Sequence, residues 1–350
     1  MDEGVRCMIM RGGTSKGAFF IESELPADEV ERDDFLMRIM GTPDPRQVDG
    51  IGGAHPLTSK VAVVSSTDDP DADVSYLFLQ LGVDEAFVTD RQNCGNLLAA
   101  VGPFALERGL IHVPDGEAVV RIKMRNTDGV AVSRFQVREA APVYSGDTAI
   151  SGVPGTAGRI AIDFLGIAGG TAGALLPTGN PVDVINGVEA TLVDNGMPVV
   201  VMRADALGVS GYEDCSELEA NESLRGRLEE IRLTAGELMN LGDVSDTTIP
   251  KLTMVAPPRK GGAVATRTFI PHRCHDAIGV LGAVSVATTC LLPGTPAHGI
   301  CEVSSSTVTL EHPTGTFDAV VEVDGFDTVR AGIIRTARKL MDGTVFPRAY

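Results

Sequence analysis

A lysine and a cysteine occupy positions in this sequence where the local chain favours a reactive side chain. Lys60 ends the glycine-rich segment 49–60 (DGIGGAHPLTSK) and directly precedes the apolar run 61–64. A lysine at the mouth of a buried strand is partly removed from water, which disfavours the ammonium form and makes the neutral amine available as a base. A solvated lysine at a strand end is the alternative that these residues alone leave open.

Cys94 lies in the segment 92–96 (QNCGN), at the start of a predicted apolar helix. Unpaired N–H groups and the dipole at a helix start stabilise a thiolate, so this position favours a reactive cysteine. A small buried cysteine that only packs is the alternative. Proton transfer is the chemistry that a desolvated lysine and an activated cysteine could perform together.

The segment 10–17 (MRGGTSKG) could bind an anion, because it combines two cations, Arg11 and Lys16, with hydroxyl groups and glycines. It lacks the GxxxxGK[ST] spacing of a phosphate loop, so a carboxylate is favoured over a nucleotide. A tight turn between two strands is the structural alternative.

The segment 271–276 (PHRCHD) contains two histidines, a cysteine and an aspartate, which invites a zinc interpretation. A zinc site needs further ligands at suitable spacing, and no second pair of that kind occurs. We therefore expect no metal, and we interpret His272 and Arg273 as donors to a carboxylate. No GxGxxG dinucleotide fingerprint is present.

Two predicted helices are apolar on nearly all sides and must therefore be buried. One opens at Asn93 and runs toward Leu106, and the other opens near Ile278 and runs toward Leu292. A helix without a polar face is surrounded by other elements, so we expect a sheet wrapped around each. Their glycine-rich starts leave N–H groups uncovered, which favours anions. If the two starts face each other, they form a site for a polycarboxylate.

Short β-rich runs separated by turn residues make up most of the remaining chain, and two further helices are expected at 28–40 and 216–239. The predicted strands are 61–65, 74–82, 119–124, 130–137, 159–164, 189–193, 198–202, 252–255, 264–270, 306–310 and 319–323.

Length and composition set broad limits on the kind of protein. A chain of 350 residues suggests about two domains. The net charge of −18 argues against nucleic acid and anionic membranes as partners. No apolar run of about 18 residues and no signal peptide is found, and the six cysteines form no CxxC pair. We therefore expect a cytoplasmic protein with free thiols.

Several motifs together resemble a known family. They are MRGGTSKGAFF, QVDGIGGAHPLTSKVAVV, QNCGNLLAAVGPFALERGL, LLPTGNPVD, DNGMP, MNLGDVS and IPHRCHDAIGVLGAVSVA. In this order they closely resemble the 4-oxalomesaconate tautomerase (Δ-isomerase) group of the PrpF-like isomerases, which share the diaminopimelate-epimerase fold. The resemblance covers nearly the whole chain.

The resemblance implies an α+β fold of two similar domains, each a barrel-like, mostly antiparallel sheet wrapped around a central buried helix. The N-terminal domain would span 1–165, with the C-terminal strand 333–350 returning to it, and the second domain would span 166–332. Members of this fold are often dimers, so a homodimer is also an expectation.

The resemblance further implies that Lys60 and Cys94 face the substrate. Family members that epimerise amino acids use a second cysteine where this chain has Gly279, and Cys274 lies five positions earlier. This difference favours an isomerase over a two-thiol racemase. The expected substrate-binding residues are Arg11, Gly13, Thr14, Ser15, Lys16, Thr58, Ser59, Asn93, Gly95, Asn96, Asn180, His272, Arg273, Gly279, Leu281 and Gly282.

The expected activity is a cofactor-independent allylic (1,3) proton transfer, or keto–enol tautomerisation, on the tricarboxylate 4-oxalomesaconate, in gallate- or protocatechuate-type aromatic-acid catabolism. Lys60 would be the base, and Cys94 would be the acid or would stabilise charge. A 2-methylaconitate cis-trans isomerase is the nearest alternative. A non-catalytic polycarboxylate-binding relative is the alternative from another class.

Overall fold

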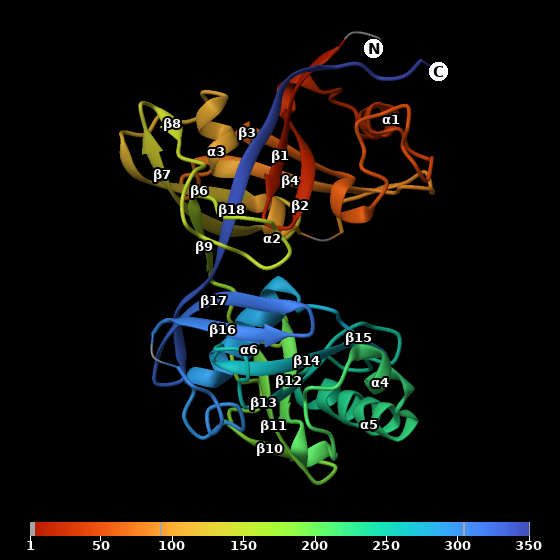
Figure 1. Ribbon diagram of the computed structural model, residues 1–350, viewed down its shortest axis with the longest axis vertical. Coiled ribbons are helices and arrows are strands. Elements are labelled where there is room, and N and C mark those ends of the chain that lie inside the picture. Colours follow the sequence, from red (N-terminus) through yellow and green to blue (C-terminus); the bar gives the residue numbers. More distant parts are fainter. Residues whose placement is uncertain (1–3, 92, 304, 350) are drawn as a thin grey trace. The chain divides into compact units, whose positions relative to one another are not determined.

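The chain divides into two α+β units in the computed structural model, which describes residues 4–91, 93–303 and 305–349 (Figure 1). The first unit comprises Met1–Ile162 and Arg335–Tyr350, and the second comprises Asp163–Ile334. Two strands, β9 (Arg159–Leu165) and β18 (Asp327–Val345), carry the chain between the units. Strands dominate both units and helices are few, so the predicted fold class is confirmed.

The first unit is built on a row of six neighbouring strands. In spatial order they are β1 (Val5–Gly12), β2 (Ser15–Ile21), β3 (Lys60–Ser66), β4 (Val74–Leu81), β6 (Gly116–Met124) and β7 (Gly129–Arg138). Successive pairs are antiparallel, parallel, antiparallel, parallel and antiparallel. β18 pairs with β1, and β9 pairs with both β7 and β18, so the row closes into a barrel-like sheet.

The second unit repeats this topology. Its six strands in spatial order are β11 (Val188–Asp194), β12 (Pro198–Arg203), β13 (Lys251–Ala256), β14 (Val264–Ile270), β16 (Thr307–His312) and β17 (Gly315–Asp324). They show the same alternation of antiparallel and parallel pairs. Short strands extend the sheets of both units, namely β5 (Val88–Thr89), β8 (Ala141–Pro142), β10 (Asp183–Ile185) and β15 (Arg273–Cys274).

The predicted apolar helices lie at equivalent points of the two units, before β6 and before β16 (Figure 1). The second is one helix, α6 (Val280–Leu291), which is buried along most of its length. The first is two helices, α2 (Gly95–Leu98) and α3 (Val101–Glu107), so the expectation of one continuous helix was wrong. Pro103 explains the break, because it has no N–H to donate to the carbonyl of Ala99.

The outer helices pack against the opposite side of each sheet. In the first unit α1 (Glu29–Met40) covers an apolar core that includes Phe20, Val61 and Leu79. In the second unit α4 (Cys215–Ala220) and α5 (Glu222–Leu238) cover the corresponding core. The predicted single helix 216–239 is thus divided, because the Asn221 side chain accepts a hydrogen bond from Leu224 N and starts a new helix.

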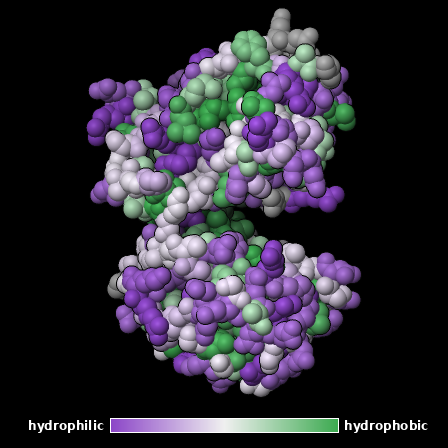
Figure 2. Space-filling view, turned by 45° about the vertical axis from the view of Figure 1, so that its right-hand side comes forward, coloured by the Kyte–Doolittle hydropathy of each residue, from purple (hydrophilic) through white to green (hydrophobic). Residues whose placement is uncertain are grey.

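The outer surface of both units is mainly hydrophilic in the view of Figure 2. This agrees with a composition in which 22% of the residues are charged. In the part of the chain that the structure describes, no helix is both long and apolar enough to cross a membrane.

Candidate active site

Lys60 is the first residue of β3, and its side chain points into the first unit. The side chain is 6% exposed, and Nζ donates a hydrogen bond of 2.6 Å to Oε1 of Gln80. The same nitrogen lies 4.9 Å from the centre of the Phe78 ring. β3 runs along the centre of the sheet, between β2 and β4, which is why the start of this strand is removed from water.

Cys94 is the N-cap residue of α2 and is half-buried. Its backbone N–H donates to the side chain of Asn93, whose amide nitrogen lies 2.7 Å from the sulfur of Met124. Because α2 has only four residues, fewer peptide dipoles are aligned behind the cysteine than in the long helix that the sequence predicted. Gln92, which precedes this motif, lies outside the described residues.

One face of β4 carries the side chains that contact Lys60. Tyr76, Phe78 and Gln80 alternate along this strand and therefore share a face. Burial raises the pKa of Tyr76, and the charge of Cys94 raises it further, which places the phenol near the thiol. Among the described residues, the Tyr76 hydroxyl has no hydrogen-bond partner.

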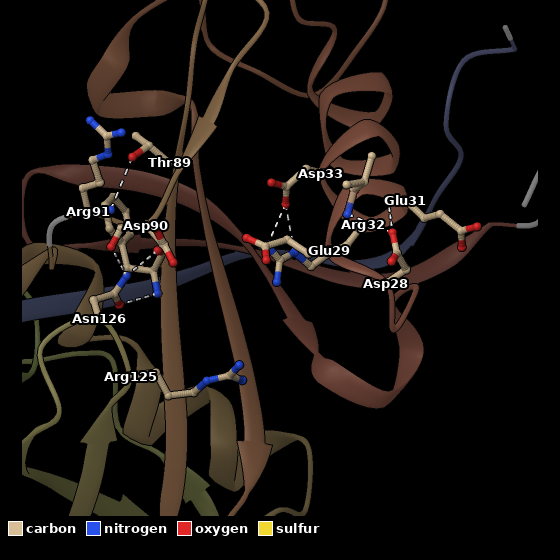
Figure 3. Close-up of polar contacts among 12 residues, drawn as sticks. Asp28, Glu29, Glu31, Arg32, Asp33, Thr89, Asp90, Arg91, Arg125 and Asn126 are labelled. Carbon is tan, nitrogen blue, oxygen red and sulfur yellow. Dashed lines mark hydrogen bonds and ion pairs between the residues drawn. The ribbon is translucent and has the colours of Figure 1, made fainter.

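Asn126 attaches β4 to the segment that leads to Cys94 (Figure 3). Its side chain accepts from the backbone N–H of Phe78 at 2.9 Å and donates to the Phe78 carbonyl at 2.9 Å. It also donates to the carbonyl of Asp90 at 2.7 Å. This one amide therefore fixes both the strand under Lys60 and the approach to Cys94.

The turn between β1 and β2 packs directly on the start of α2. A Cβ at Gly13, where φ is +50°, would lie 2.2 Å from Oδ1 of Asn96, so only glycine fits there. Oδ1 of Asn96 accepts from Arg335 Nε at 3.1 Å and lies 3.5 Å from the backbone nitrogen of Thr14. Ser15 follows this turn as the first residue of β2, and its buried hydroxyl has no partner among the described residues.

The side chain of Arg11 holds this turn by hydrogen bonds to its backbone and to Thr336. Its Nη1 atom donates to the carbonyl of Gly13 at 2.9 Å and to the carbonyl and hydroxyl of Thr336, both at 3.0 Å. Burial lowers the pKa of the guanidinium, and Arg338 on the neighbouring strand lowers it further. Part of its hydrogen-bonding capacity is thus used to hold the protein backbone.

Lys16 and Thr58 meet around Gly53. A Cβ at Gly53 would lie 2.3 Å from Oγ1 of Thr58 and 3.2 Å from Nζ of Lys16. The adjacent Ser59 is buried, and its hydroxyl donates to Oε1 of Gln47 at 2.7 Å. The structure therefore gathers Lys16, Thr58 and Lys60 at one end of the sheet, whereas the Ser59 hydroxyl is engaged elsewhere.

The remaining predicted residues belong to the second unit. Gly279 is the N-cap of α6, and a Cβ at Gly279 or Gly282 would meet no heavy atom within 4 Å, so space lies open beside the first turn of this helix. Leu281, on the same turn, is partly exposed. His272 and Arg273 are exposed, and Nδ1 of His272 lies 3.8 Å from Oε2 of Glu229.

Asn180 and Cys274 have local partners within the second unit. The Asn180 side chain donates to Asp183 at 2.9 Å. Cys274 is buried, and burial raises the pKa of its thiol. Residues 4–91, 93–303 and 305–349 include no group of three or more histidine, cysteine, aspartate or glutamate side chains that could hold a metal.

Two polar residues of this region were absent from the sequence prediction. Gln80 was overlooked because it stands in an otherwise apolar strand (VSYLFLQL), although its polarity there is itself a signal. Arg335 is 5% exposed and comes from the far end of the chain, and no motif marks it.

Comparison with known proteins adds independent information. The sequence profile of the PrpF protein family matches residues 3–348. A protein named (4E)-oxalomesaconate Delta-isomerase from Novosphingobium sp. is 58% identical over 97% of this chain and 96% of its own. A 4-oxalomesaconate tautomerase from Pseudomonas putida is 52% identical over 97% and 95% of the two chains.

Relatives named for other acids are less similar. A 2-methyl-aconitate isomerase from Shewanella oneidensis is 34% identical over 97% of this chain and 96% of its own. The crystal structure of a methylitaconate-delta-isomerase, 32% identical, superposes with a TM-score of 0.92 over 99% of this chain and 96% of that chain. A hydroxyproline epimerase, 14% identical with a TM-score of 0.54 over 98% and 92%, shares the fold alone.

Proposed function

The chain belongs to the PrpF family and is an isomerase, and we propose that its substrate is 4-oxalomesaconate. The observation that carries this proposal is the 58% identity, over almost the full length of both chains, to a protein named for that substrate. The relative named for 2-methylaconitate is only 34% identical. The reaction would then belong to the breakdown of aromatic acids of the gallate or protocatechuate type.

The proposed chemistry is a 1,3 transfer of a proton. In a tricarboxylate whose ketone is conjugated to a C=C bond, the γ-carbon is acidified by conjugation. Lys60, as the neutral amine, removes that proton and leaves a dienolate. A proton then returns at the α-carbon, or at oxygen if the product is the enol. No electrons leave the substrate, so the reaction needs no redox cofactor.

Residues of the first unit supply the remaining roles in this proposal. Lys16 and the Thr14 hydroxyl bind a carboxylate, and backbone N–H groups at the start of α2 stabilise the developing oxyanion. Cys94 returns the proton or stabilises charge. The support is that Lys16 and Lys60 lie at one end of the sheet and that Thr14 borders α2. His272, Arg273, Gly279, Leu281 and Gly282 remain predicted binding residues.

The proposal is tested by following 4-oxalomesaconate with the purified protein in D₂O by NMR. We expect conversion, with deuterium entering the γ- or α-carbon as the double bond moves. 2-Methylaconitate serves as the comparison substrate. A kcat/KM that is higher for 2-methylaconitate than for 4-oxalomesaconate would show that 4-oxalomesaconate is not the preferred substrate. Thermal stabilisation by both acids without any exchange would indicate a binding protein instead.

A further inference from the structure

The candidate base is held by a glutamine on the neighbouring strand. Lys60 and Gln80 are direct partners in the antiparallel pairing of β3 and β4, and Lys60 Nζ lies 2.6 Å from Gln80 Oε1. The Phe78 ring, 4.9 Å from the same nitrogen, lies on the same face of β4. Because the lysine side chain is 6% exposed, these two neighbours largely determine where its nitrogen lies.

The amide of Gln80 can point in only one direction. Its nitrogen donates to the carbonyl oxygens of Pro56 at 3.2 Å, Ser59 at 3.1 Å and Leu81 at 3.0 Å. Reversing the amide would bring its oxygen against three carbonyl oxygens, none of which can donate. The oxygen of Gln80 therefore faces Lys60, and the same side chain fixes the turn that precedes the lysine.

The group that accepts the hydrogen bond from Lys60 is the amide oxygen of Gln80, which is neutral. An amide oxygen accepts a hydrogen bond from both an ammonium and an amine, whereas a carboxylate at this distance would favour the ammonium. Within the described part of the chain, the lysines that form ion pairs are Lys123 and Lys339, and Lys60 forms none. On β2 the residue opposite Lys60 is Gly17, and the neighbouring charged residue there is Lys16.

We propose that Gln80 is a positioning residue that holds the nitrogen of Lys60 in place while leaving it able to gain and lose a proton. This inference rests on the proposed role of Lys60 as the base. A base must pass between amine and ammonium in every turnover, and a neutral, rigidly oriented acceptor permits both forms. In the proposed role, Gln80 itself exchanges no proton and touches no substrate.

Two variants test the proposal in the full-length protein. Gln80→Glu replaces the neutral acceptor by a charged one, and Gln80→Met removes the acceptor. Both variants also remove the N–H groups that donate to the carbonyl oxygens of Pro56, Ser59 and Leu81, so the thermal stability of each variant is measured beside its activity. We expect kcat to fall about tenfold or more in both, with little change in KM, because the base is misplaced or held as ammonium. Gln136→Glu, which adds the same charge at an exposed position of the same unit, should leave both constants unchanged.

A second measurement does not depend on activity. The NMR signal of the Lys60 ε-carbon, identified by its loss in Lys60→Met, is followed as the pH is raised. We expect Gln80→Glu to move the deprotonation of Lys60 upward by about one pH unit or more, and Gln136→Glu to leave it unmoved.

The two measurements separate the two claims. If Lys60 titrates alike in the parent protein and in Gln80→Glu, the positioning role is overturned, whatever the activity. The positioning role is also overturned if Gln80→Met keeps the kcat of the parent protein, or if its loss of kcat is no larger than its loss of thermal stability explains. If the parent protein isomerises none of the acids while the Lys60 titration shifts as expected, the proposed substrate fails and the positioning role stands.

Discussion

The residues around Lys60 and Cys94 hold the two side chains to different degrees. Lys60 is buried, bonded to Gln80 and packed over Phe78. Cys94 is half-buried at the start of a four-residue helix. A group that is held in one place suits proton abstraction at a defined carbon, and a looser group suits a supporting role. In the proposed mechanism, we therefore expect Lys60 to contribute more to catalysis than Cys94.

Replacing the two residues should reveal this difference. We expect Lys60→Met to lower kcat by about 10³-fold and to abolish deuterium uptake, since a general base contributes roughly 10²–10⁴-fold. Cys94→Ser should lower kcat less, by about tenfold to a hundredfold. Lys123→Met and Cys301→Ser are the matched controls. Near-normal exchange in Lys60→Met would remove the lysine from the mechanism.

Cys301 should be an unusually reactive thiol outside the candidate site. The neighbouring Cys290 thiol, aided by the charge of His298, lowers the pKa of Cys301 from 9.0 to about 7, although the protonated Cys301 thiol can also donate to the Cys290 carbonyl at 3.1 Å. The interaction with Cys301, together with burial, raises the pKa of Cys290. A lowered thiol pKa means that the thiolate, the form that reacts, already predominates above about pH 7.

The expected result is that alkylation of Cys301 by iodoacetamide accelerates through pH 7 and levels off before pH 9, the ordinary cysteine value. Peptide mass spectrometry at several pH values measures this. The pKa of buried Cys7 is raised to about 12, mainly by burial, so Cys7 is the internal control. A Cys301 rate that keeps climbing beyond pH 9 would contradict the prediction.

At the scale of elements, α5 depends on a fully buried arginine. The Arg232 guanidinium donates to the carbonyl oxygens of Val244 at 2.8 Å and Ile249 at 3.2 Å, and it pairs with Glu229. These carbonyls belong to the loop that leads into β13, so one side chain connects the helix to the sheet. Removing it leaves buried acceptors without a donor.

We therefore expect Arg232→Met to lower the free energy of unfolding by about 3 kcal/mol. Arg227→Met, on the same helix and partly exposed, should change it by less than about 0.5 kcal/mol. Urea unfolding followed by circular dichroism measures both. Equal stability of the two variants would show that the loop finds other donors.

At the scale of the whole molecule, β18 belongs to both units. Its first half pairs with β17, and its second half pairs with β1 of the first unit. The second half also supplies Arg335 to Asn96 and Asp342 to Arg108. The first unit is therefore incomplete until the end of the chain has been added.

Deleting residues 335–350 should consequently unfold the first unit and spare the second. We expect trypsin to degrade residues 4–162 rapidly while a fragment from the region 163–334 persists. Limited proteolysis with mass spectrometry reports both, and the full-length chain is the control. Survival of an intact first unit in the truncated chain would mean that β1 can close the sheet by itself.

The elements of this fold differ in how well the sequence predicts them. Runs of apolar and β-branched residues predicted most of the central strands, and the absence of a polar face predicted that α3 and α6 are buried. The β1 and β2 hairpin was expected only as the alternative interpretation of segment 10–17, and the strand 333–350 was expected from the family resemblance and not from the pattern of its residues. Their residues satisfy no simple alternation, because pairing with distant strands stabilises them.

The fold class, the family and the residue types available for chemistry could all be predicted without a structure, because they follow from local composition and from motifs along the chain. The neighbours of those residues depend on how distant segments come together in the fold. Gln80 meets Lys60, and Arg335 meets Asn96 across 239 positions, through strand register and through the return of β18. Register depends on the packing of the whole sheet, so no local pattern contains it.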